Sequence, residues 1–436
     1  MGPGARRHTD EFTRRNGHAV TLKSPSRALI VIALMASTLH HAARADVQGP
    51  YGSMFSFNGF GTVGVVHSSE DKADFTANDF EPNGAGYSRS WSASVDSLIG
   101  GQVLATLGSQ LSAVVQVIAQ QNYDDTYTPH LEWANLKYLL TEDFSVRVGR
   151  IVIPTFLDSD SREVGYSNPW VRPPTEVYGA NPITSVDGFD ASYRWRLAGV
   201  TNTLQVNYGR NLAFNFAGGS KFDAKYVWGI FDKAEYGPAL IRAGYLSSNI
   251  TLNDATALFD GLRQFGPQGA AIASQYEVVD KSSSILTVAA SYDPGRWFVM
   301  GEWATSRSQS FLGANTGWYL SGGRRAGPFT PYLTYAQVTQ RSNSSAGLSI
   351  AGLPADLVPV ATALNAGLND GLNSRPDQYT LSVGVRWDFM KNLDVKLQLD
   401  RIDLGAGSAG TLINPQPGFQ PGSTVFLFSS VVDFVF

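Results

Sequence analysis

The residues of this chain that could do chemistry are mostly charged side chains. Arg172 stands beside Trp170, Pro173 and Pro174, and prolines stiffen the backbone on either side of a residue. An arginine held in this way could clamp an anion or a carboxylate through paired hydrogen bonds. The alternative is that this segment pins its loop to a wall of the fold.

The sequence gives little support to catalysis. The chain has no cysteine, which excludes disulfides, thiolate metal sites and cysteine nucleophiles. A hydrolase would need serine, histidine and a carboxylate at one site, but neither His67 nor His130 lies in a recognisable nucleophile motif. Phosphate-binding glycine loops, zinc-ligand spacings and EF-hand patterns are also missing. The sequence therefore predicts no enzyme, no metal site and no cofactor.

Other charged residues occupy alternate positions in short apolar segments. Segment 144–150 includes Arg147 in this way, 190–196 includes Arg194 and Arg196, 380–387 includes Arg386 and 393–400 includes Lys396. Period-two alternation over about ten residues is typical of membrane β-barrel strands. A soluble sandwich also alternates, but long charged side chains on the second face need water. Only a wide barrel provides a wet interior.

Sixteen such segments can be counted. They begin near residues 55, 88, 103, 130, 144, 189, 202, 223, 238, 285, 296, 316, 328, 378, 392 and 424. Long connections between them alternate with short ones such as Gly100-Gly101, and outer-membrane barrels show the same alternation with an even strand number. We therefore predict an all-β fold, a transmembrane antiparallel β-barrel of about 16 strands with short periplasmic turns and long external loops.

The first 45 residues are predicted to be a signal peptide. A basic region precedes the apolar run 28–39, and Ala43-Arg44-Ala45 provides a cleavage site. Residues 46–436 would then form the barrel. The segment 1–45 holds seven of the 33 basic and two of the 37 acidic residues, so the remainder has 26 basic and 35 acidic residues and a formal net charge of −9. This charge argues against nucleic acid as a partner.

Two of the long connections are rich in alanine and leucine, namely 249–284 and 341–377. They could form short helices at the mouth of the barrel, fold into its lumen or contact a neighbouring subunit. The sequence leaves these three arrangements open.

In these respects the chain resembles the sixteen-stranded porins of Gram-negative outer membranes. The local marks are residues 55–62 on the first predicted strand and the terminal Phe436 after alternating apolar residues. The resemblance implies a passive diffusion channel for small hydrophilic solutes or ions in the cell outer membrane. It also implies a homotrimer in contact with lipid and lipopolysaccharide. Phe434 and Phe436 would be read by the barrel-assembly machinery.

The same family folds its third external loop into the barrel, and the corresponding segment here is 153–188. Loop carboxylates that face basic residues of the wall would set a field across the pore. The resemblance implies these candidates for constriction and selectivity: Asp158, Asp160, Glu163 and Arg172 in the loop, and Arg147, Arg194, Arg196, Arg386 and Lys396 on the wall, with Lys137 and Arg242 as further candidates. The loop differs from that of general porins because it lacks their acidic-phenylalanine-glycine turn.

Two alternatives to a general diffusion channel remain at this point. Inward arginines would attract anions, which favours a substrate-selective channel for small carboxylates, although the net charge of −9 argues against it. A non-conducting barrel that acts as an enzyme or a binding protein belongs to a different class.

Overall fold

The structure is a computed structural model that describes residues 54–436 apart from 180, 218, 254, 341–343 and 374–375. The predicted signal peptide, residues 1–45, lies outside the described residues.

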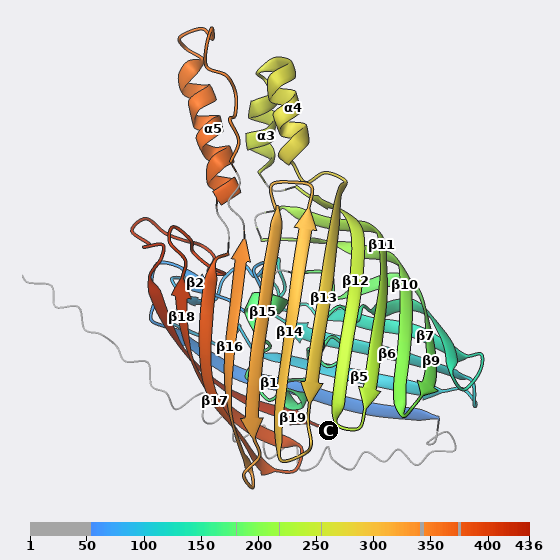
Figure 1. The fold of residues 1–436 in the computed structure, drawn as a ribbon. Coiled ribbons are helices and arrows are strands. Elements are labelled where there is room, and N and C mark those ends of the chain that lie inside the picture. The colour runs from blue at the N-terminus through green and yellow to red at the C-terminus, as the bar shows by residue number, and fades with distance from the viewer. Residues whose placement is uncertain (1–53, 180, 218, 254, 341–343, 374–375) are drawn as a thin grey trace, which may run out of the picture. The chain divides into compact units, whose positions relative to one another are not determined.

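Within this part of the chain, sixteen long strands form one closed antiparallel sheet (Figure 1). Each strand pairs with the next, and the last, β19, pairs with the first, β1. Closure removes free sheet edges, as hydrocarbon surroundings require. The strands are β1 (Phe55–Ser68), β5 (Leu98–Thr106), β6 (Leu111–Gln120), β7 (His130–Leu139), β8 (Phe144–Val152), β9 (Ser185–Leu197), β10 (Val200–Asn215), β11 (Lys221–Tyr236), β12 (Ala239–Leu252), β13 (Lys281–Tyr292), β14 (Trp297–Ser308), β15 (Ala314–Arg324), β16 (Phe329–Gln340), β17 (Gln378–Met390), β18 (Leu393–Leu404) and β19 (Thr424–Val435).

The two faces of this sheet differ in polarity, as the alternation predicted. Trp303, Leu320 and Leu399 are exposed on the outer face. Their neighbours in sequence, such as Glu302 and Asp400, are buried on the inner face. An apolar exterior with a polar interior is the arrangement of a barrel that lies in a membrane and encloses water.

Connections between the described strands alternate in length, which confirms the sixteen-strand prediction. Eight connections of five or more residues alternate with seven of two to four residues. The longer ones are 69–97, 121–129, 153–184, 216–220, 253–280, 309–313, 341–377 and 405–423. Small elements lie within them: β2 (Asp74–Phe75), β3 (Ala85–Gly86), β4 (Trp91–Ser92), the 3-10 helix η1 (Gly165–Ser167) and α2 (Thr175–Tyr178).

The predicted position of the second strand was wrong. Residues near 88–97 belong to the first loop, with only β4 paired to β1, and Gly100-Gly101 lies inside β5 rather than in a turn. The reason is a close side-chain contact. A Cβ on Gly100 would come within 2.3 Å of the Phe60 ring on β1. Glycine is therefore needed at this position to leave space for the ring, and not to form a turn.

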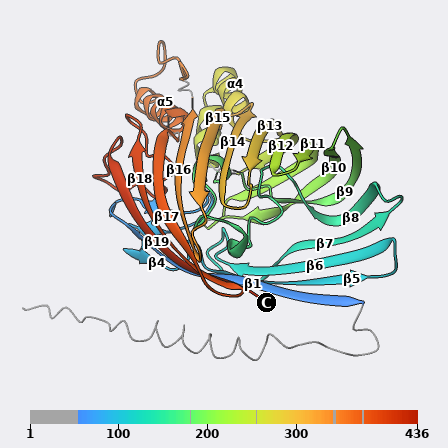
Figure 2. The same cartoon turned by 60° about the horizontal axis from the view of Figure 1, so that its bottom comes forward.

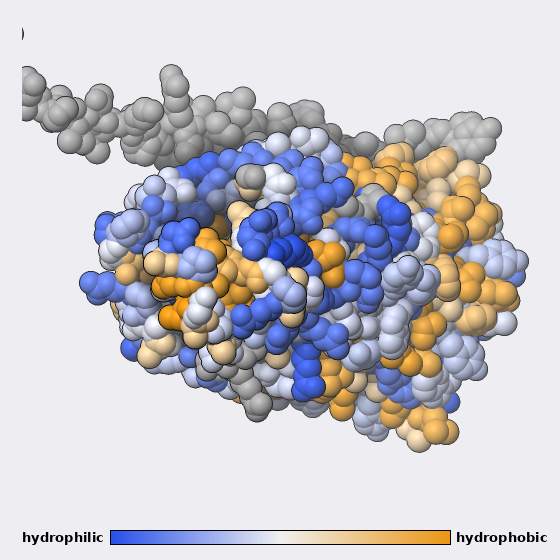
Figure 3. All heavy atoms as spheres, turned by 90° about the horizontal axis from the view of Figure 1, so that it is seen from above, coloured by the Kyte–Doolittle hydropathy of each residue, from blue (hydrophilic) through white to orange (hydrophobic). Residues whose placement is uncertain are grey.

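Both alanine- and leucine-rich loops carry helices, which is the first of the three arrangements left open by the sequence. They are α3 (Thr256–Arg263) and α4 (Gly266–Tyr276) in one loop and α5 (Val358–Asn373) in the other. Phe259, Leu262 and Leu368 belong to one buried cluster that joins the two loops. No helix among the described residues is long and apolar enough to cross a bilayer. From above, hydrophilic side chains cover much of the molecule, while apolar ones gather in a patch on the left of the view and along its right side (Figure 3).

The seam between β1 and β19 depends on glycines that accept the terminal aromatic rings. A Cβ on Gly59 would lie 2.2 Å from the Phe436 ring, whereas its partner across the β1–β5 pair, Gly101, has open space. We expect Gly59→Val to destabilise the barrel by about 1–3 kcal/mol because the ring must be displaced. The temperature at which the folded gel band is lost would measure this effect. Gly101→Val is the matched control, and Phe436→Ala should relieve the Gly59→Val defect; equal losses in both glycine variants would contradict this explanation.

Candidate functional site

The connection 153–184, called here the infolded loop, lies inside the barrel. Figure 2 shows the segment between β8 and β9 crossing the lumen. Its backbone and side chains contact inner-face residues of distant strands: the Leu157 amide donates to Glu302 Oε1 (3.0 Å) and Trp170 Nε1 donates to Ser321 Oγ (2.8 Å). The sequence-based range ended at 188, but β9 already begins at Ser185.

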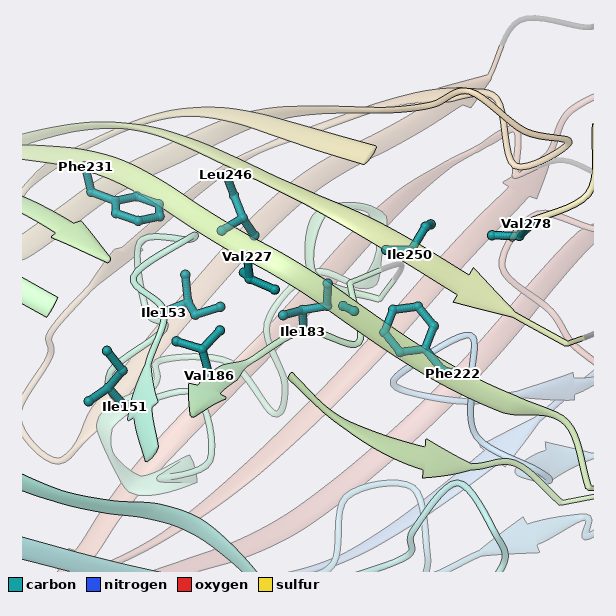
Figure 4. Close-up of a cluster of buried hydrophobic side chains, with 11 residues drawn as sticks. Ile151, Ile153, Ile183, Val186, Phe222, Val227, Phe231, Leu246, Ile250 and Val278 are labelled. Atoms are coloured by element: carbon teal, nitrogen blue, oxygen red, sulfur yellow. The ribbon is translucent and has the colours of Figure 1, made fainter. Parts of the chain in front are cut away.

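Both ends of the infolded loop are held by an apolar cluster on the inner face (Figure 4). Ile153 and Ile183 come from the loop, and the Ile153 amide donates to the Thr184 carbonyl (2.9 Å). They pack with Val227 and Phe231 of β11 and with Leu246 of β12. Burial of these side chains stabilises the entry and exit of the loop against one wall.

Arg172 ties the middle of the infolded loop to the opposite side. Its guanidinium forms two hydrogen bonds with Asp96 (2.7 and 2.6 Å), lies 3.8 Å from Asp400 and donates to Ser429 Oγ (2.8 Å). Burial opposes the charge of Arg172, but Asp96, Asp400 and Tyr332 together outweigh it, and the pKa of Arg172 is raised. Arg172 therefore attaches the infolded loop to the barrel wall. Its guanidinium is bound to the carboxylates of Asp96 and Asp400.

Arg386 and Lys396 bind the backbone of the infolded loop. Arg386 Nη1 donates to the carbonyls of Tyr166 (2.6 Å) and Asn168 (3.1 Å), and Lys396 Nζ donates to that of Gly165 (2.6 Å). Lys396 also lies 2.8 Å from Asp433 Oδ2. These two wall residues contact the loop, but at its carbonyls rather than at its carboxylates.

The remaining predicted basic residues are spread over the inner wall. Arg147 forms a paired contact with Asp190, and Arg242 donates to the Pro154 carbonyl of the infolded loop (2.5 Å). Arg194 pairs with Asp143 in the short turn 140–143 (3.2 Å). Two further side chains are exposed: Arg196, close to that end of the barrel, and Lys137 on β7. The structure thus does not bring Arg194 and Arg196 to the infolded loop.

The three predicted loop carboxylates have different surroundings. Burial raises the pKa of Asp158 to about 6, against the opposing effect of Arg242. Asp160 is exposed. Glu163 lies 3.7 Å from Arg162, and burial raises its pKa. Of the three, only Glu163 lines the large cavity beside the loop.

This cavity has a volume of about 610 Å³ and lies between the infolded loop, the loops 69–97 and 121–129, and the wall from β7 to β10. Its described lining contains three arginines, each near a carboxylate: Arg150 with Asp187 (2.8 Å), Arg162 with Glu163 (3.7 Å) and Arg172 with Asp96 (2.6 Å). Three lining carboxylates remain without an arginine: Glu81, Asp124 and Glu132. With neutral histidine the lining therefore has an excess of negative charge.

Sequence reasoning missed these three carboxylates because it looked for acidic residues only in the third loop. Glu81 belongs to the first long loop, Asp124 to the second, and Glu132 to β7. The high acidic content of the first two loops was a usable signal. No group of three or more histidines and carboxylates in the described chain is arranged to hold a metal ion.

Comparison with known proteins found no matching family model and no matching curated protein. Several solved structures share the fold. An anion-selective porin from Comamonas acidovorans is 13% identical, with a TM-score of 0.51 over 88% of this chain and 99% of that chain. OmpF of Salmonella typhi, in complex with daunomycin, is 14% identical, with a TM-score of 0.51 over 88% and 97%. OmpT, an outer membrane protein of Vibrio cholerae, is 12% identical, with a TM-score of 0.51 over 90% and 100%. The chain therefore shares the β-barrel fold of these outer-membrane proteins, two of which are porins.

Proposed function

We propose that this protein is an outer-membrane porin through which small hydrophilic solutes and ions diffuse passively, with a preference for cations. The observation that carries the proposal is the cavity beside the infolded loop. Its arginines lie beside carboxylates, Asp124 and Glu132 remain as excess negative charge, and Glu81 adds to this charge once the pH passes its pKa of about 8. Charged side chains around a narrow passage favour ions of the opposite sign.

A channel is favoured because sixteen strands enclose a lumen too wide for wall side chains alone to fill. The infolded loop narrows this lumen, and we assign the size limit for solutes to it. An enzymatic role has weaker support. His67 stacks on Trp91 and donates to the Ser90 carbonyl (2.6 Å), while His130 lies 3.6 Å from Glu132. Among the described residues, neither histidine is paired with a serine hydroxyl in a nucleophile–base arrangement.

The geometry supports selectivity for small carboxylates less well. Arg147, Arg172 and Arg386 are all engaged with carboxylates. An anion that bound one of them would have to displace that carboxylate.

Further parts of the proposal concern surroundings and assembly. The apolar outer face supports contact with lipid, and the external loops support contact with lipopolysaccharide. The shared porin fold supports a homotrimer, which cross-linking in detergent would test. Phe434 and Phe436 stack on each other at the end of β19, where the barrel-assembly machinery could recognise them after removal of a signal near Ala45.

The central test is conductance of the refolded protein in a planar bilayer under a KCl gradient. We expect stepwise, persistent channels whose reversal potential shows K⁺ to be more permeant than Cl⁻. A protein that is folded, as shown by heat-modifiable gel mobility, but electrically silent would contradict the porin proposal. A reversal potential of opposite sign would contradict only the cation preference.

Cation preference should also increase as the pH rises from about 5.5 to 8.5. Burial raises the pKa of Asp79 to about 7 and that of Glu81 to about 8, with further increases from Glu176 and Glu163 respectively. A carboxyl with a raised pKa stays neutral at low pH and becomes negative only as the pH passes that value. Reversal potentials across this range would measure the effect, and Glu81→Gln should reduce its upper part. A constant selectivity would show that these groups do not face the permeant ions.

A further inference from the structure

Two residues that line the cavity, Gln121 and Asn211, have buried amide oxygens that lack a donor among the described residues. Gln121 is 3% exposed, and its Nε2 donates to Asn83 Oδ1 and Asp125 Oδ1 (3.0 Å each). Asn211 is 8% exposed, and its Nδ2 donates to the Ser185 carbonyl (3.0 Å). Only the NH₂ end of an amide can donate, so these bonds fix both orientations. No donor among the described residues reaches Gln121 Oε1 or Asn211 Oδ1.

Glu81 adds a carboxyl acceptor to the same cavity, and this group becomes negative as the pH passes its pKa of about 8. Its Oε2 also lacks a donor among the described residues. The charged groups that act on it are Glu163 and Arg162 of the infolded loop, Asp125 of the second loop and Asp96 of the first. Three of these four are carboxylates, so a cation from outside is the group that would most stabilise ionised Glu81.

Two aromatic rings complete the lining. Tyr123 and Phe214 both border the cavity, with ring centroids 5.0 Å apart, and the Tyr123 hydroxyl accepts a hydrogen bond from Asn78 Nδ2 (3.1 Å). Aromatic faces attract cations, and they also pack against the C–H groups of a solute.

From these observations we propose that the cavity contains a binding subsite for small organic cations that carry several hydroxyl or N–H donors, such as amino-polyols. The ammonium group would lie near Glu81, and the remaining donors would satisfy the oxygens of Gln121 and Asn211. The volume of about 610 Å³ lies within the range of small-molecule sites. The subsite rests on the proposed porin function, because the solute reaches it through the barrel.

Three solutes with the same six-carbon chain separate charge from size: glucamine is a cation, sorbitol is neutral and gluconate is an anion. Each would be added to single channels in KCl at pH 8.5, where Glu81 is mostly ionised, and the concentration that halves the current would be measured. We expect glucamine to act at a concentration about tenfold lower than sorbitol. Its ammonium group forms a charged hydrogen bond with Glu81 that sorbitol lacks, and such a bond strengthens binding by about this factor. Gluconate should have the weakest effect.

Variants localise the binding. Glu81→Gln keeps the shape of the side chain and should raise the half-blocking concentration of glucamine towards that of sorbitol. Asn211→Leu removes one acceptor and should weaken both solutes. The control is Asp356→Asn, an exposed carboxylate in the loop that carries α5, which should leave all three values unchanged. Glucamine should also bind more tightly at pH 8.5 than at pH 6.5, since Glu81 ionises over this range.

The outcomes distinguish the subsite from the porin function. If channels conduct KCl but glucamine, sorbitol and gluconate block alike, or if Glu81→Gln leaves glucamine block unchanged, the subsite is wrong and the porin function stands. If the folded protein never conducts, the porin function fails first. Tight glucamine block that Glu81→Gln abolishes would support both.

Discussion

Lys396→Met is expected to destabilise the barrel by about 3–5 kcal/mol, because it removes one partner of a buried ion pair. Lys396, Asp394 and Asp433 are all fully buried, and Lys396 Nζ lies 2.8 Å from Asp433 Oδ2 and 3.8 Å from Asp394 Oδ1. Arg386 still reaches Asp394 (3.1 Å), so Asp433 is the carboxylate left without a cation. The same substitution frees the Gly165 carbonyl of the infolded loop.

Urea unfolding of the refolded protein in detergent would measure this loss of stability. The double variant Lys396→Met with Asp433→Asn removes the isolated negative charge. The amide oxygen of the new side chain can still accept the hydrogen bond that Thr62 donates to Asp433 in the structure. It should recover much of the lost free energy of unfolding. A double variant no more stable than Lys396→Met would show that the loss comes from packing or from the loop carbonyl instead.

Arg172→Met is expected to have the second large effect, on the pore itself. This arginine joins the infolded loop to Asp96 of the first loop, Asp400 of β18 and Ser429 of β19. Without it two buried carboxylates lose their cation, which costs about 3–5 kcal/mol, and the loop loses its attachment to that wall. Single-channel conductance should increase and its open-channel noise should grow.

The matched control is Arg194→Met. Arg194 is also an inner-wall arginine paired with an aspartate, but the pair is exposed in a short turn, where such contacts contribute about 0–1 kcal/mol. Its conductance and stability should stay close to those of the unchanged protein. Equal behaviour of the two variants would show that Arg172 does not hold the loop in place.

Much of the barrel could be read from the sequence because its determinants are local. Alternation in segments such as 380–387 and 393–400 reflects a wall between lipid and water, and each strand shows it independently of its neighbours. The error near residue 100 has a different origin. Gly100 makes room for Phe60 on the adjacent strand, and a single sequence shows a glycine pair there without showing the ring that it faces.

The site was predictable only in part, for the same physical reason. Alternation along the chain predicted the order of the strands and the alternation of long and short connections, but it placed the end of the first loop too early and the end of the third four residues too late. The partners of the buried charges became known from the folded chain: Arg172 meets Asp96, 76 residues away, and Lys396 meets the Gly165 carbonyl, 231 residues away. The folded chain also shows that Glu81 and Glu132 face one cavity. The period-two alternation of a strand can be recognised from neighbouring residues in the sequence. The partner of a buried charge depends instead on where the infolded loop crosses the lumen.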